Sequence, residues 1–326
     1  MSDIKSPGKY PLIRLEIDKI PDQAGRFCSS YGFDNSELKR SISQIGIINN
    51  PYIFRNSDGS IEVVTGFRRM LILKELNVNE VECFDLTDSG LSEYDMLSFA
   101  IHDNLFARRF NLVEKSIILN MLIELTKEIS SINEFCFLLD VNLRDYELVL
   151  KIEGLDKYIK DSIACETLNI KALEQLINLG SDNCLICTTW INELKLNYNQ
   201  QIQFIDYMKD ITRINKISIR QLLDDEYYSN LLTDKKKNIP QKARELIENL
   251  RERRNPDFHR YKNLFDRNIK RLKLPKNVKI NHPRYFESEF YHLEVEFKDG
   301  IELKNSLKGL MDRDELENVG DPWLNE

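Results

Sequence analysis

The sequence predicts an α+β protein with a small N-terminal α/β domain, an all-helical middle and a small α+β C-terminal domain. Short strand-like and helical patterns alternate over residues 10–91. Helical periodicity then persists for about 140 residues, and a strand pattern returns after residue 290. We therefore expect domains over residues 1–91, 92–232 and 233–326.

In the first domain, apolar and charged residues alternate over 13–18, which predicts a strand. Two further apolar runs, 51–55 and 61–65, flank the turn-forming sequence 56–60 and predict a hairpin. The remaining elements expected here are a helix over 38–45, a helix from Gly66 to Leu76 and a strand over 81–86.

The central helices carry start signals in the form of capping pairs, Ser92 with Asp95 and Asn111 with Glu114. A helix over 132–139, a turn at 140–142 and a helix over 143–152 have the lengths of a helix-turn-helix. The last domain is expected to hold a helix over 240–254, a second helix after the break at 255–256, a half-buried strand over 291–297 and a helix over 301–311.

Composition excludes several classes of protein. The chain has 326 residues, 42% of them hydrophobic, and a net charge of -7, so a sizeable core is expected. No apolar run approaches the ~18 residues of a membrane span, and the first residues lack a signal-peptide pattern. We therefore expect a cytoplasmic protein with reduced cysteines. Cys184 and Cys187 are interpreted as a buried helix face, with a metal site as the minor alternative.

Positive charge is concentrated in residues 235–284, which hold 17 Lys and Arg against 5 Asp and Glu. Such a stretch attracts phosphate backbones, although a solvated helix face is an equal alternative. In the helix-turn-helix segment two acidic residues would repel DNA, so a purely structural hairpin is favoured there. The candidate DNA-binding residues are Arg144, Lys151, Arg251, Arg253, Arg254, Lys270 and Arg271.

One segment, Thr65-Gly66-Phe67-Arg68-Arg69, predicts phosphate binding. It carries a strand into the start of a helix, where free backbone N–H groups favour an anion. Glycine allows close backbone approach, and two guanidinium groups add charge-assisted hydrogen bonds. The alternative is that these are ordinary surface arginines at a helix start.

A second polar segment lies about 35 residues further on. Asp103 and Asn104 supply hard oxygen ligands suited to a Mg²⁺ ion that carries phosphates, and Arg108 is placed to face the same phosphates. The alternative is an ordinary polar helix surface beside a capped neighbour.

Taken in order, these motifs resemble the ParB chromosome-partitioning family, whose N-terminal domain has the ParB/sulfiredoxin-type fold. The resemblance covers roughly residues 10–180 and is carried by SISQIGIINNPYIF, VVTGFRR and HDNLFARRFNLVEKS. It implies a protein that binds CTP, or another NTP, with Mg²⁺ and closes as a nucleotide-gated clamp on DNA. It also implies a homodimer and, for a partition role, a partner ATPase.

Carried over position by position, the resemblance implies the residues of the site. Residues 46–51 match a segment that lines the base pocket, and Asp103 with Asn104 matches the pair near the metal. The implied nucleotide-binding residues are Gln23, Arg26, Thr65, Gly66, Phe67, Arg68, Arg69, Asn104 and Arg108.

The sequence departs from the family pattern at two of these positions. Phe67 stands where the family usually has a glutamate, and a phenyl ring cannot place water or metal, so hydrolysis is in doubt while binding is not. Sulfiredoxin needs a cysteine at this position, so that activity is not expected. Asp103 replaces a glutamate and is a shorter carboxylate. A phosphotransferase or NTPase on the same fold and a nucleotide-free adaptor remain alternative functions.

Overall fold

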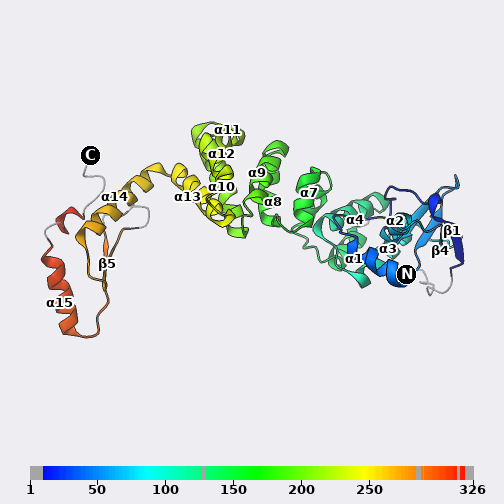
Figure 1. Ribbon diagram of the computed structural model, residues 1–326, viewed down its shortest axis with the longest axis horizontal. Coiled ribbons are helices and arrows are strands. Elements are labelled where there is room, and N and C mark those ends of the chain that lie inside the picture. The colour runs from blue at the N-terminus through cyan, green and yellow to red at the C-terminus, as the bar shows by residue number, and fades with distance from the viewer. Residues whose placement is uncertain (1–9, 127–128, 284–287, 289, 314–315, 320–326) are drawn as a thin grey trace. The chain divides into compact units, whose positions relative to one another are not determined.

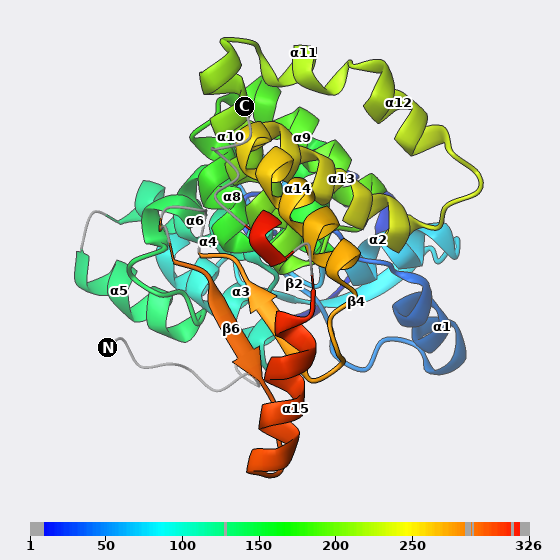
Figure 2. The ribbon, with the colours of Figure 1, turned by 90° about the vertical axis from the view of Figure 1, so that its left-hand side faces the viewer.

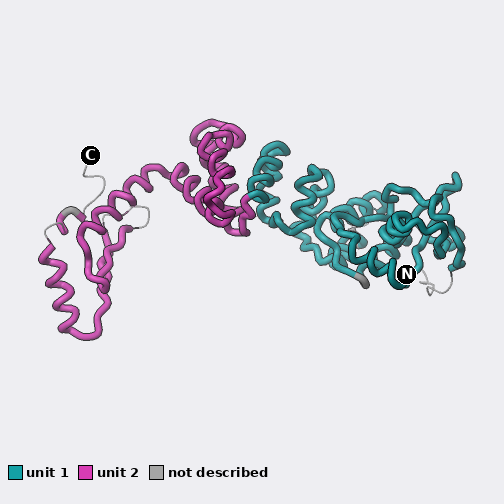
Figure 3. The backbone as a smooth tube through the Cα atoms, in the orientation of Figure 1, with its two compact units in different colours: residues 1–193 teal, residues 194–326 magenta. Residues whose placement is uncertain are grey.

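The computed structural model describes residues 10–126, 129–283, 288, 290–313 and 316–319. It divides into two compact units, residues 1–193 and 194–326 (Figure 3). The structure is α+β, mostly helical with a small mixed sheet, which confirms the predicted class (Figure 1). The domain boundaries expected after residues 91 and 232 stay predictions.

The sheet of the first unit has four strands in the order β1-β4-β2-β3. These strands are β1 (Leu12–Glu16), β2 (Tyr52–Arg55), β3 (Ile61–Thr65) and β4 (Glu80–Asp85), each within two residues of its predicted position. β2 and β3 form the expected antiparallel hairpin, and β2 runs parallel to β4. The hairpin turn is held by Asp58, whose carboxylate accepts from the backbone N–H and hydroxyl of Ser60.

Helices cover both faces of this sheet, and the two faces form separate apolar cores. On one face, Ile53 and Val63 pack with Ile42 of α1 (Ser36–Ile45) and Met70 of α2 (Phe67–Glu75). On the other face, Tyr52 and Val64 pack with residues of α3 (Glu93–Ala107) and α4 (Leu112–Leu125). Side chains alternate between the two faces along a strand, so Val63 and Val64 near the end of β3 pack into opposite cores.

The predicted capping pairs begin the two helices next to the sheet. Ser92 caps α3 together with Asp95, and Asn111 caps α4 together with Glu114, each as a reciprocal capping box. The remaining helices of this unit are η2 (Ile17–Lys19), α5 (Ile129–Leu138), α6 (Tyr146–Ile152), α7 (Lys157–Ala164), α8 (Ile170–Ile177) and α9 (Ser181–Glu193).

The hairpin of α5 and α6 differs from the predicted helix-turn-helix in its turn. The second helix was expected from residue 143 but begins at Tyr146. The side chain of Asn142 accepts a hydrogen bond from the backbone N–H of Arg144, and this local turn delays the helix. Val149 of α6 and Phe135 of α5 are buried in the same core as α3 and α4, so the hairpin packs into the unit.

The middle helices bury their apolar faces. Cys184 and Cys187 lie one turn apart on α9 and are both buried, which confirms their interpretation as a packed helix face. No helix in the described part of the chain is long and apolar enough to cross a membrane.

In the second unit, α10 (Tyr198–Asn215) packs along α13 (Ile239–Arg254). The C-terminal part joins α14 (Pro256–Leu272) to a two-stranded antiparallel sheet of β5 (Val278–Asn281) and β6 (His292–Val295), with α15 (Gly300–Met311) beside it (Figure 2). The other elements are α11 (Ile219–Leu223), α12 (Glu226–Thr233) and η4 (Leu316–Asn318).

Two features of this last part correct the sequence prediction. β5 was not predicted, because its four residues include only two apolar side chains. β6 was predicted as half-buried, but three of its four residues are exposed, and Leu293 retains 49% of its accessible surface. A two-stranded sheet has too little neighbouring structure to bury both of its faces.

Candidate functional site

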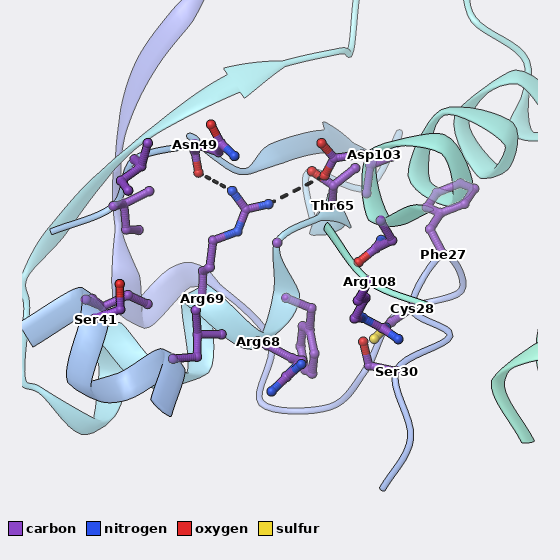
Figure 4. Close-up of a pocket in the computed structure, with 18 of the residues that line it drawn as sticks. Phe27, Cys28, Ser30, Ser41, Asn49, Thr65, Arg68, Arg69, Asp103 and Arg108 are labelled. Atoms are coloured by element: carbon purple, nitrogen blue, oxygen red, sulfur yellow. Dashed lines mark hydrogen bonds and ion pairs between the residues drawn. The ribbon is translucent and has the colours of Figure 1, made fainter. Parts of the chain in front are cut away.

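A pocket of about 310 Å³ opens where β3 ends, α2 begins and α3 passes over the sheet (Figure 4). Its volume lies at the lower end of the range for small-molecule sites, about 300–1,000 Å³. Most of the residues predicted to bind a nucleotide line it. The predicted residues in its wall are Thr65, Gly66, Phe67, Arg68, Arg69, Asp103, Asn104 and Arg108.

The turn at Gly66 gives the pocket its shape. Gly66 has a left-handed φ of 85° and forms the N-cap of α2, so the first N–H groups of this helix begin at the pocket wall. A Cβ atom at this position would come within 2.9 Å of the Arg69 guanidinium. Only glycine fits this turn without strain, and an anion is favoured at the helix start that it creates.

Arg69 is fixed between two segments of the wall. Its Nη2 lies 3.6 Å from Oδ2 of Asp103, and its Nη1 donates to the backbone carbonyl of Asn49 (Figure 4). The side chain is only 18% exposed. Burial lowers the pKa of the guanidinium, and the charge of Asp103 opposes this shift. Arg69 therefore joins α2, α3 and the segment after α1 and orients all three around the pocket.

Arg68 and Arg108 come together on one aromatic ring. The guanidinium carbon of Arg68 lies 4.3 Å from the centroid of the Phe33 ring, and that of Arg108 lies 4.2 Å from it. Burial lowers the pKa of Arg68, and the like charge of Arg108 lowers it further. An anion placed between these two cations would relieve their repulsion.

The acceptors that hold Arg68 are neutral. Its Nε donates to the amide oxygen of Asn35 at 2.7 Å, and its Nη2 donates to the carbonyl oxygen of Asp34 at 3.1 Å. These contacts orient the guanidinium without an ion pair, and the carboxylates of Glu114 and Asp34 favour its charge only through space. Neither Asn35 nor Asp34 was among the predicted site residues, because the loop before α1 has no periodic pattern that would place it.

Arg108, in contrast, is held by a buried carboxylate. Both of its terminal nitrogens donate to Glu114 at 2.7 Å, and Glu114 is completely buried. The same carboxylate accepts from the backbone N–H groups of Asn111 and Tyr31. The sequence predicted Glu114 only as a capping residue. Its capping pair with Asn111 is the one signal in the sequence that places it close to Arg108, at the end of α3.

Asp103 and Asn104 follow each other on α3 and both line the pocket. The amide nitrogen of Asn104 donates to the carbonyl of Ala100 at 2.8 Å. Within the described residues no three His, Cys, Asp or Glu side chains gather closely enough to hold a metal ion. Asp103 and Asn104 therefore do not form a complete Mg²⁺ site by themselves. They fit a phosphate-bound Mg²⁺ ion, whose coordination phosphate oxygens and water would complete.

Part of the pocket wall is apolar. Leu38 and Ile42 of α1 line it together with Ile47 and Ile48 of the segment that follows. Ile48 is 77% exposed, which is a large apolar surface for a side chain at a pocket mouth. This is the segment that the family resemblance assigns to a base pocket.

Two predicted phosphate contacts lie outside this pocket. Gln23 lines a separate pocket of about 230 Å³, which has Phe67 in its wall as well. The Arg26 guanidinium is held by the carboxylates of Glu62 and Glu93, and Glu62 also accepts from the Arg26 backbone N–H at 2.7 Å. Arg26 does not line the main pocket, and its contact with phosphate stays a prediction.

Phe67 packs against the apolar core formed by α1, α2 and the sheet. Its ring thus completes the wall between the glycine turn and the core. The position that the family resemblance gives to an acid is here part of an apolar surface.

The candidate DNA-binding residues divide into two groups. Arg253 and Arg254 form ion pairs of 2.6 Å with Asp225 and Asp210, and each lies over a tyrosine ring. The remaining candidates are exposed, namely Arg144, Lys151, Arg251, Lys270 and Arg271.

No family model and no curated protein matches the chain. Solved structures do match. C-terminally truncated ParB from Caulobacter crescentus, complexed to the centromeric parS site, is 13% identical, with 58% of this chain and 96% of that chain covered at a TM-score of 0.34. The structure neighbours are ParB proteins.

Two further ParB structures show the same level of likeness. The Caulobacter protein complexed with CTP-γ-S is 13% identical over 56% of this chain and 98% of that chain, at a TM-score of 0.26. A Pnob8-like ParB-N domain is 18% identical over 74% of this chain and 97% of that chain, at a TM-score of 0.36.

Proposed function

We propose that this chain is a ParB-like protein that binds a nucleotide, CTP with Mg²⁺, and acts on DNA as a nucleotide-gated clamp or regulator in the cytoplasm. The observation that carries the proposal is that one pocket is lined both by arginines and by apolar side chains. A nucleoside triphosphate has both chemistries, a polyanion and a flat ring. The motif resemblance makes CTP the first nucleotide to test.

In this proposal the triphosphate lies against the Gly66 turn, with Arg68, Arg69 and Arg108 around its oxygens. Asp103 and Asn104 would hold Mg²⁺, which neutralises part of the phosphate charge when bound. The base would cover the exposed face of Ile48, which removes apolar surface from water.

The proposal is tested by titration calorimetry of the wild-type chain with each of the four NTPs, with and without Mg²⁺. We expect CTP with Mg²⁺ to bind tightest and the affinity to fall when Mg²⁺ is withheld. If none of the four binds, the nucleotide-free adaptor replaces this proposal.

We propose binding with at most slow turnover, because Phe67 supplies no group that could place a water molecule. Phosphate release well above background, lost in Asp103→Ala, would instead favour the phosphotransferase or NTPase.

We also propose that the protein is a homodimer through its C-terminal part, which a partition role would pair with a partner ATPase. Large apolar side chains are exposed on β6, just after it and on α15, and we infer that they contribute to an interaction surface. They include Leu293, Phe297, Ile301 and Met311, which are 49%, 52%, 73% and 80% exposed. Light scattering of the wild-type chain and of Ile301→Asp should give a dimer and a monomer, and a wild-type monomer would contradict this.

A further inference from the structure

The hydroxyl of Thr65 is a buried polar group that no other described residue satisfies. Thr65 is 2% exposed, and its Oγ1 is one of two buried side-chain atoms in the described residues with no hydrogen-bond partner. The other, Nε2 of His259, lies in the second unit. A buried hydroxyl without a partner is destabilising, so its presence calls for a physical reason.

The position of Thr65 gives that reason. It is the last residue of β3, directly before the left-handed turn at Gly66, and it lines the pocket. Figure 4 shows it beside Asp103, close to the ion pair that Asp103 forms with Arg69. The same pocket wall holds Arg68, Arg69 and Arg108 and the start of α2, and these groups attract an anionic oxygen.

We propose that the Thr65 hydroxyl donates a hydrogen bond to a phosphate oxygen of the bound ligand and so determines specificity for a phosphorylated ligand. This inference rests on the proposed nucleotide site and adds a specific contact to it. The unpartnered hydroxyl destabilises the free protein, and the bound ligand removes this destabilisation. A phosphate oxygen can only accept hydrogen bonds, so the threonine oxygen is the donor.

The two roles of the hydroxyl predict that one substitution has opposite effects on the stability of the free protein and on its affinity for CTP. Thr65→Val keeps the shape of the side chain and removes the unsatisfied oxygen, so the free protein should be as stable as the wild type or more stable. The same change removes a hydrogen bond to a charged acceptor, so affinity for CTP with Mg²⁺ should fall about ten- to a hundredfold. Thr65→Ser keeps the hydroxyl and should bind CTP with nearly wild-type affinity.

The matched control is Thr188, which is also completely buried but donates its hydroxyl to the carbonyl of Cys184 at 2.8 Å. Thr188→Val should leave CTP affinity unchanged. The experiment measures melting temperature and calorimetric affinity for CTP and for inorganic triphosphate, each with Mg²⁺. The loss in Thr65→Val should appear with both ligands, because both carry the phosphate oxygens.

Failure of this inference and failure of the nucleotide site give different results. If the wild type binds neither ligand, the proposed function is wrong and this inference falls with it. If the wild type binds CTP and Thr65→Val binds it equally well, the site stands and the role of Thr65 is wrong. A loss with CTP but not with inorganic triphosphate would also overturn it, because the hydroxyl would then contact the nucleoside.

Discussion

The pocket of the first unit and the basic helices of the second unit both gather arginines, but Arg68 of the pocket is held by a different kind of acceptor from Arg253 and Arg254. In the pocket, Arg68 is oriented by neutral oxygens from Asn35 and Asp34. On α13, Arg253 and Arg254 are oriented by carboxylates, which cancel their charge. A neutral acceptor fixes a guanidinium without an ion pair, whereas a carboxylate fixes it and offsets part of its charge. In the pocket, Arg69 and Arg108 also contact carboxylates, those of Asp103 and Glu114, so Arg68 is the pocket arginine whose hydrogen-bond acceptors are both neutral.

The largest expected effect comes from Glu114, the buried carboxylate that holds Arg108 of the pocket wall. Glu114→Ala would leave Arg108 without its bidentate acceptor and two backbone N–H groups unpaired. We expect a loss of about 3 kcal/mol in the free energy of unfolding, measured by urea denaturation. Glu124→Ala, at an exposed position of the same helix, should change it by less than about 0.5 kcal/mol. Equal losses in the two variants would contradict the role of Glu114.

The next effect concerns DNA. It contrasts two arginines of α13 that form ion pairs and two exposed basic residues of α14. Lys270→Ala with Arg271→Ala removes two exposed charges from α14, and Arg253→Ala with Arg254→Ala removes two charges that are already compensated. Only the first pair should weaken retention on DNA at low salt and reduce the slope of log affinity against log salt, by about 2. Retention unchanged in the α14 variant, or equally reduced in both, would sink the proposed DNA surface.

A smaller effect follows from Cys28 in the pocket wall. Burial raises the pKa of this thiol, so at neutral pH less of it is thiolate and its alkylation should be slow. Because the pKa is raised, the rate should increase with pH beyond the range where an ordinary thiol has levelled off. Cys165 is exposed and provides the internal control in the same mass-spectrometric assay. CTP should slow alkylation of Cys28 alone, and equal protection of both cysteines would argue against a ligand in this pocket.

The local parts of this site could be predicted from the sequence. The hairpin, the glycine turn and the two capping boxes depend on residues within a few positions of each other, and their patterns are strong. The resemblance implied that the Gly66 turn and Asp103 share one site, and Arg69 and Asp103 do form an ion pair there.

The remaining parts depend on where a loop without periodicity lies. Arg26 was expected at the phosphates, yet Glu62 and Glu93 hold it elsewhere, and nothing near Arg26 in the sequence indicates this. Phe33 likewise gains its role only because α2 and the end of α3 bring Arg68 and Arg108 to it. Contacts between segments that are distant in the sequence decide both cases.

The central claim is that Arg68 keeps its charge for a phosphate ligand. Its most direct test is calorimetry of CTP with Mg²⁺ against the wild type, Arg68→Ala and Arg254→Ala. We expect Arg68→Ala to lower the affinity at least about tenfold and Arg254→Ala, which pairs with Asp210 outside the pocket, to leave it unchanged. Unchanged affinity in Arg68→Ala, with the wild type binding normally, would contradict the account.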